Sequence, residues 1–194
     1  MTTGPVTARG VATRRRIVEA AIAEFARYGI AGARVERIVG DARTNKAQLY
    51  AYFGSKERLF DAVFLESLEH IADAVAFDAT DLADWAVRLY DEYLENPDLI
   101  RLATWARLER SPEGRLAPEV EKFDDAKIRA IAQAQADGIV RSGDPYDLMA
   151  LVIAMSMTWS PVSNVYAASA GEPTDRHDQR RALLREAVQR AVAP

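Results

Sequence analysis

Apolar residues recur along most of the chain at intervals of three and four positions, which is the period of an α-helix. Between residues 13 and 28, for example, Ile17, Ala21, Phe25 and Tyr28 fall on one helical face. No stretch of the chain alternates between apolar and polar residues, as a half-buried strand does. The pattern therefore predicts an all-α protein.

Glycine, proline and helix-capping residues divide this pattern into about nine helices. The expected helices cover residues 13–28, 35–42, 46–53, a long stretch after Ser55, 82–94, 98–109, 118–136, 145–168 and 175–193. Pro161 lies inside the eighth of them. We expect it to kink that helix, because proline lacks an N–H and its ring clashes with the preceding turn.

The second and third expected helices are short and are joined by a turn at Arg43–Thr44. Two short helices joined in this way are typical of a helix-turn-helix. Asn45 can cap the third helix, because its side-chain oxygen can accept a hydrogen bond from a free N–H of the first turn. Leu49 and Phe53 lie one turn apart on the buried face, which leaves the other side chains of this helix at the surface.

Charge is distributed unevenly along the chain of 194 residues. Residues 1–58 carry 11 Lys and Arg and 5 Asp and Glu, so their net charge is +6, whereas the remainder carries −10. A basic segment on an acidic body indicates that only the basic segment faces a polyanion, although chance clustering on solvated helix faces is the alternative. The charge distribution favours a division into a DNA-binding domain over residues 1–55 and a larger helical domain over residues 56–194.

The segment 38–56, IVGDARTNKAQLYAYFGSK, resembles the recognition segment of the TetR family. The specific part is Leu-Tyr-x-Tyr-Phe-x-Ser-Lys at 49–56, preceded at the expected distance by a first helix with Glu24-Phe25 and Gly29. The similarity covers roughly residues 12–65. It implies a dimeric transcriptional regulator, most often a repressor, that binds a palindromic operator in double-stranded DNA.

Outward residues of the third helix are candidates for reading DNA. A glutamine can contact adenine through two hydrogen bonds, a lysine can reach guanine or a phosphate, and Ala47 is small enough to allow close approach to the groove. The resemblance gives Tyr50, Tyr52 and Lys56 contacts to phosphates, although both tyrosines could instead be partly buried aromatic residues. The predicted DNA-contacting residues are Arg34, Asn45, Lys46, Ala47, Gln48, Tyr50, Tyr52 and Lys56.

Three residues depart from the family pattern. Arg43 stands where the family usually has glycine, so the turn is either mildly strained or differently shaped. Ala33 stands where a hydroxyl residue usually caps the second helix, so that cap is missing. Gly40 lies inside the second helix, where glycine costs about 1 kcal/mol relative to alanine.

The middle of the chain is rich in aromatic residues, which suits a largely apolar pocket for a small organic inducer. Aromatic residues at helical spacing also form ordinary cores, and this alternative stays open. The candidate ligand-binding residues are Phe64, Trp85, Trp105, Phe123, Met155 and Trp159.

The last two helices are the best candidates for a homodimer interface, since a dimer doubles the DNA surface that one recognition helix can read. The candidate interface residues are Met149, Val152, Ile153, Leu184 and Val188, unless they form the core of a monomer.

Several classes of function are disfavoured by composition. The chain has no cysteine and only two histidines, and it contains neither a nucleophile–base motif nor a glycine-rich phosphate loop. We therefore expect no enzyme, cofactor or metal site. With neither a transmembrane stretch nor a signal peptide in view, we expect a cytoplasmic protein without a membrane partner. The favoured function is a repressor released by a small apolar or aromatic inducer, and the alternative is a DNA-binding regulator without an inducer.

Overall fold

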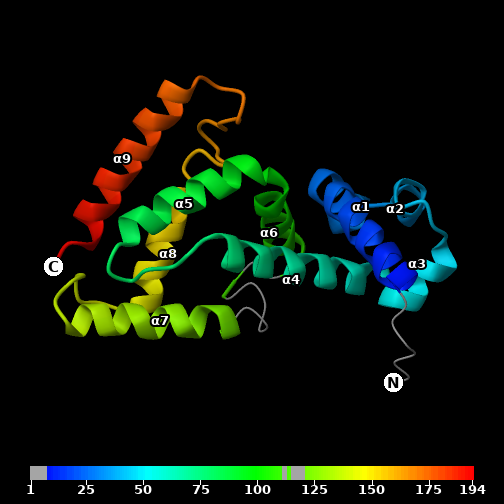
Figure 1. Cartoon of the computed structure of the whole chain (residues 1–194), viewed down its shortest axis with the longest axis horizontal. Helices are drawn as coiled ribbons and strands as arrows, with labels where there is room; N and C mark the ends of the chain where they lie inside the picture. Colours follow the sequence, from blue (N-terminus) through cyan, green and yellow to red (C-terminus); the bar gives the residue numbers. More distant parts are fainter. Residues whose placement is uncertain (1–7, 111–112, 115–120) are drawn as a thin grey trace. The chain divides into compact units, whose positions relative to one another are not determined.

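The computed structural model describes residues 8–110, 113–114 and 121–194, without the side chains of residues 121–124. Within these residues the chain contains nine α-helices and no strand, which confirms the all-α prediction (Figure 1). The helices are α1 Ala8–Gly32, α2 Val35–Asp41, α3 Lys46–Phe53, α4 Lys56–Ala74, α5 Leu82–Glu95, α6 Pro97–Glu109, α7 Glu121–Ala136, α8 Pro145–Ser156 and α9 Thr174–Val192. The expected beginning of the seventh helix, at residue 118, lies outside the described residues.

The chain forms two compact units. The first comprises Met1–Ser67 and Arg101–Leu116, and the second comprises Leu68–Ile100 and Ala117–Pro194. The boundary expected at residue 55 falls inside the first unit, because the beginning of α4 supplies part of its core. Phe60 of α4 is fully buried and packs edge-on against Phe25 of α1, with 5.2 Å between ring centroids.

Helices α1, α2 and α3 pack around a small apolar core. Its side chains Ile17, Phe25, Ile38 and Leu49 have no exposed surface, as their helical spacing predicted. Tyr28 is an exception to that prediction. Its ring is 38% exposed and lies under the Arg37 guanidinium, 4.2 Å from the ring centroid.

Helix α1 is interrupted at Gly29, whose φ of 69° and ψ of −177° are not helical. The N–H groups of Ile30 and Ala31 beyond the break donate to the two Glu109 carboxylate oxygens, at 2.8 and 2.9 Å. The Trp105 indole N–H donates to the Ala26 carbonyl at 3.2 Å. The C-terminal part of α6 therefore supplies the partners that the interrupted end of α1 lacks.

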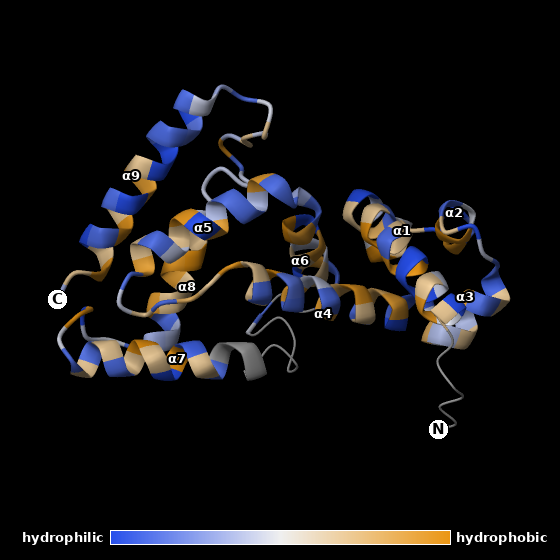
Figure 2. Cartoon of the chain, viewed as in Figure 1, coloured by the Kyte–Doolittle hydropathy of each residue, from blue (hydrophilic) through white to orange (hydrophobic). Residues whose placement is uncertain are grey.

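The second unit is built around α8, which is the most uniformly hydrophobic helix in Figure 2. Helices α5, α7 and α9 pack against it, and α5 also packs along α9. Ion pairs at the surface join α5 to α9: Arg181 to Asp91 and Arg185 to Asp84, each at 2.8 Å. The side chains of α8 that are buried in this core are Leu148, Met149, Val152 and Ser156.

The extent of α8 was predicted wrongly. The helix ends at Ser156, and the residues up to Pro173 form turns and loop where we expected helix as far as residue 168. A proline disfavours helical geometry at the residue before it as well as at its own position, so Pro161 ends the helix and does not merely kink it. The Ser156 and Thr158 hydroxyls donate to carbonyls three residues earlier, which helps to terminate the ladder of helical hydrogen bonds.

No described helix is both long and apolar enough to cross a bilayer. In the same part of the chain, His, Asp and Glu side chains nowhere gather in threes as the ligands of a metal ion do.

Candidate nucleic-acid interface

Helix α3 is defined by local signals at both of its ends. The Asn45 side-chain oxygen accepts from the Gln48 N–H at 2.9 Å, which confirms the expected cap. Gly54 ends the helix with a φ of 80°. Directly afterwards the Ser55 hydroxyl accepts from the Arg58 N–H at 3.2 Å, and α4 begins. These caps fix which side chains α3 presents to solvent.

Seven of the eight predicted DNA-contacting residues are exposed; six of them lie on α3 or at its N-cap, and Arg34 directly precedes α2. They are Arg34, Asn45, Lys46, Ala47, Gln48, Tyr50 and Tyr52. Lys56 is half-buried, and its ammonium lies 3.4 Å from the Ala31 carbonyl and 3.3 Å from the Ala33 carbonyl. Most of the predicted residues therefore lie together on α3 or at its N-cap. Lys56, at the start of α4, also contacts backbone carbonyls of the same chain.

Two of the candidate base-reading side chains already have partners. The Lys46 ammonium pairs with the Glu36 carboxylate at 2.5 Å, and this hydrogen bond raises the pKa of Lys46. The Thr44 hydroxyl donates to the Gln48 side-chain oxygen. Sequence reasoning missed both partners, since Glu36 lies on a different helix and Thr44 was read only as a turn residue. These contacts use one donor of Lys46 and the side-chain oxygen of Gln48, and they leave further N–H donors on each side chain.

The turn between α2 and α3 is strained at Arg43, which stands where the family pattern has glycine. Arg43 has a φ of 51°, and it is the one non-glycine residue with positive φ in the described part of the chain. The Arg16 side chain donates to the Ala42 carbonyl at 3.0 Å and so holds the end of α2 from the side of α1. The turn therefore keeps the shape that glycine normally provides, at a cost in backbone energy.

Arg43→Gly is expected to raise the free energy of unfolding by about 0.5–1 kcal/mol, because glycine adopts this φ without strain but loses more entropy on folding. Urea unfolding of the full chain measures the difference. Arg34→Gly is the matched control, since Arg34 has an extended φ of −117° and gains nothing from glycine. Equal changes for the two variants would contradict the assignment of strain to Arg43.

The start of α2 lacks a side-chain cap, as the sequence indicated, but the capping position is residue 34 and not Ala33. Arg34 is the capping residue and makes no such bond, but its N–H donates to the Glu24 carboxylate at 2.8 Å. Glu24 is buried and also accepts from the Arg37 Nε at 2.8 Å. Burial alone raises the pKa of Glu24, but Arg37 and the Arg34 N–H outweigh burial and hold it below its ordinary value. Glu24 of α1 thus accepts a hydrogen bond from a backbone N–H at the start of α2, where the side-chain cap is missing.

The predicted ligand-binding residues are divided between the two units. In the first unit, Phe64 stacks on Phe60 with 6.0 Å between centroids, and Trp105 supports α1. In the second unit, Trp85 is buried edge-on against Phe77 with 4.9 Å between centroids, and Met155 packs against the same core. Trp159 lines a pocket. The Phe123 side chain lies outside the described residues.

The predicted dimer residues lie largely in the core of their own chain. Met149, Val152, Leu184 and Val188 are buried there, and Ile153 is partly buried against them. Heptad-like spacing cannot tell a core face from an interface face when a helix carries both. The large apolar side chains that these helices expose are Leu151, 45% exposed, and Leu183, 57% exposed.

A capped recognition helix joined by a tight turn to a second short helix, with an exposed polar face, defines a helix-turn-helix DNA-binding module. Residues 17–63 match the family model described as bacterial regulatory proteins, tetR family, and residues 81–190 match the tetracyclin repressor-like C-terminal domain. The chain belongs to the TetR family of transcriptional regulators, which confirms the resemblance seen in the sequence.

Individual relatives support this assignment over most of the chain. An HTH-type transcriptional repressor from Streptomyces coelicolor, SCO4008, is 40% identical over 78% of this chain and 79% of its own length. The repressor NicS from Pseudomonas putida is 31% identical over 66% of each chain. Among solved structures, the transcriptional regulator SCO4942 from Streptomyces coelicolor is 37% identical, covers 93% of this chain and 98% of its own, and superposes with a TM-score of 0.76.

Proposed function

We propose that this protein is a transcriptional repressor that binds a palindromic operator as a homodimer and is released by a small molecule. The observation that carries the proposal is the exposed polar face of α3 within a chain whose two parts both match the TetR family. Relatives that cover about two thirds or more of the chain are named as repressors, which favours repression over activation.

In this proposal the residues of α3 divide into readers and anchors. Gln48 and Lys46 contact base edges in the major groove, and Ala47 permits close approach. Tyr50, Tyr52 and Lys56 contact phosphates and set the register. Arg34 joins them as a charged anchor, because its guanidinium is exposed and makes no ion pair with any described residue.

The experiment is operator selection followed by competition binding. Gln48→Ala is expected to reduce discrimination at one base pair by about 1–3 kcal/mol while leaving affinity for random DNA unchanged. Arg34→Ala is the comparison variant. It should weaken binding to every sequence and reduce the slope of log affinity against log salt by about one. Equal losses on selected and random DNA for Gln48→Ala would remove its role as a reader.

A dimer formed by α8 and α9 follows from the same proposal. Leu151 places apolar surface on the exposed side of α8, where a second copy can cover it. A two-fold dimer presents two recognition helices to half-sites about one helical turn of DNA apart. Footprinting should therefore protect two symmetric half-sites, and one isolated half-site would contradict the proposal.

Release by a ligand requires two states with different affinities for the ligand. Helices α4 and α6 each contribute residues to both units, so a change in either helix reaches the DNA-binding unit directly. The alternative is a regulator without an inducer, which is favoured by the tight packing of Trp85 and Phe64 in ordinary cores. Operator affinity measured across a panel of small molecules that bind the protein distinguishes the two.

A further inference from the structure

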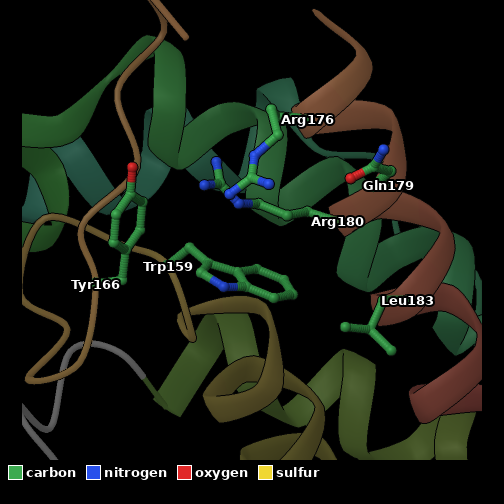
Figure 3. A pocket seen from close by; sticks show the side chains of 6 residues that line it. All are labelled: Trp159, Tyr166, Arg176, Gln179, Arg180 and Leu183. Carbon is green, nitrogen blue, oxygen red and sulfur yellow. The ribbon is translucent and has the colours of Figure 1, made fainter. Parts of the chain in front are cut away.

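A pocket of about 280 Å³ lies within the second unit, between the first half of α9 and the segment that follows α8 (Figure 3). It is larger than the cavity of about 150 Å³ that accommodates benzene in an engineered core. Its lining residues are Trp159, Tyr166, Arg176, Gln179, Arg180 and Leu183. The pocket therefore has room for one substituted ring or a short branched chain.

The side chains of this pocket combine flat apolar walls with positive charge. The Arg180 guanidinium lies 5.1 Å from the centroid of the Tyr166 ring and 5.9 Å from that of Trp159. It donates to the Glu172 carboxylate at 2.8 Å, and this hydrogen bond lowers the pKa of Glu172 to about 2. The pair is therefore ionised at any physiological pH and has no net charge.

A second guanidinium leaves the pocket with an excess positive charge. The exposed Arg176 side chain also lines the pocket, and it makes no hydrogen bond or ion pair with any described residue. Glu172 can neutralise only one of the two arginines. The pocket thus carries one positive charge that a bound anion can neutralise.

Buried polar atoms that lack a partner gather in the same region. Within the described residues they are the Ser160 hydroxyl, His177 Nε2 and Arg180 Nη1. Ser160 follows Trp159 in the chain, and His177 precedes Arg180 by one helical turn. The Tyr90 hydroxyl is bonded to His177 Nδ1 at 2.8 Å, and in the tautomer in which Nδ1 accepts, Nε2 carries a hydrogen. All three groups then offer donors, and what the region lacks is an acceptor.

We propose that this pocket binds a small organic monoanion, a carboxylate carried on a single aromatic or branched apolar body. Arg176 and Gln179 hold the carboxylate beside Arg180, and Trp159, Tyr166 and Leu183 contact the apolar body. A neutral molecule of the same shape leaves the charge of Arg176 uncompensated and gains less. The regulatory consequence of binding rests on the ligand response proposed above, but binding itself does not.

The test uses the full chain without DNA and isothermal titration with matched pairs of probes. Each aromatic or branched carboxylate, such as phenylacetate and isovalerate, is compared with its own primary amide. At least one carboxylate should bind with a Kd below about 1 mM, and its amide about tenfold more weakly or not at all. If no carboxylate of the panel binds, or if the amides bind equally well, the proposal is overturned.

Arg176→Gln should weaken carboxylate binding by about tenfold to a hundredfold, because a charge-assisted hydrogen bond is lost. Arg190→Gln is the matched control. It makes the same charge change on the same helix, at a side chain that is 79% exposed and paired with Glu186 outside the pocket. Equal effects of the two variants would show long-range electrostatics only and overturn the site. A shift of the monomer–dimer equilibrium by Arg176→Gln, without carboxylate binding, would make the pocket a contact between two copies.

Operator binding measured on the same samples separates this proposal from the proposed function. If a carboxylate binds but operator affinity stays unchanged, the pocket is a binding site that takes no part in the ligand response. If other molecules release the operator, and if Arg176→Gln responds to them as wild type does, the ligand response is supported. This pocket is then not the site of that response.

Discussion

Gly29→Ala is expected to lower the free energy of unfolding by about 3 kcal/mol, because two separate penalties act at this residue. Its φ of 69° and ψ of −177° belong to a region that glycine alone populates readily. An added Cβ would clash with Glu109 Oε1 and would lie 2.8 Å from Trp105 Cε3. The carboxylate can move aside, but only by giving up its bonds to the N–H groups of Ile30 and Ala31, and the indole is held by Ala26.

Gly40→Ala is the control for this variant, and its effect should have the opposite sign. Gly40 lies inside α2, and nothing lies within 4 Å of the position that its Cβ would occupy. Alanine in a helix interior gains up to about 1 kcal/mol over glycine. Chemical denaturation of both variants measures the contrast, and a destabilisation of similar size in both would show that neither the φ of Gly29 nor its contact with α6 matters.

Loss of the Glu24 charge has the second largest expected effect. Glu24→Gln should destabilise the protein by about 2 kcal/mol, since the Arg37 guanidinium then loses its ionic partner in a partly buried site. Glu24 is 6% exposed and accepts from Arg37 and from the Arg34 N–H, so it stabilises the start of α2 as well as the contact between α1 and α2. Glu19→Gln on the same helix is the control. Its carboxylate is 58% exposed and pairs with Arg15, so a change below about 0.5 kcal/mol is expected.

The same pair predicts how stability depends on pH. The pKa of Glu24 is lowered on folding, so its contribution is complete above its ordinary value of 4.5 and is lost as the pH falls through the lower value of the folded state. The difference in stability between wild type and Glu24→Gln should therefore be constant near neutral pH and shrink below about pH 4.5. Unfolding curves recorded from pH 7 to pH 3 measure it, and a difference that grew towards acid would reverse the assigned sign.

Gly29, Trp105 and Glu109 also bear on how a ligand signal travels. Helix α4 begins in the first unit and continues along the chain into the second. The structure adds the end of α6, whose indole and carboxylate hold the interrupted end of α1. A variant that loosens this contact should therefore change operator affinity as well as stability.

Local chemistry was sufficient to predict the recognition helix. The cap at Asn45, the stop at Gly54 and the start at Ser55 act over three or four residues, so they are legible in the sequence and the structure reproduces them. The positive φ of Arg43 belongs to the same class of signal. The turn between α2 and α3 requires a positive φ at this position, and Arg43 adopts it although it is not glycine.

Contacts between distant residues decided the rest. Trp105 and Trp159 look alike as aromatic residues on apolar helices, yet one supports α1 and the other lines a pocket. Met149 and Val188 have the spacing of an interface, but neighbouring helices bury them. Glu24 and Glu36 are ordinary acidic residues in the sequence, and only folding places Arg37 and Lys46 beside them.

By itself, the sequence determined the helical class, the DNA-reading module and its family, because these depend on short-range periodicity, caps and one dense motif. Only the tertiary structure decided which apolar faces are core, where α8 ends, and that Arg180 pairs with Glu172 beside a pocket that Arg176 also lines. The physical reason is that burial and charge pairing depend on the packing of helices far apart in the chain. Residue spacing along a single helix does not specify that packing.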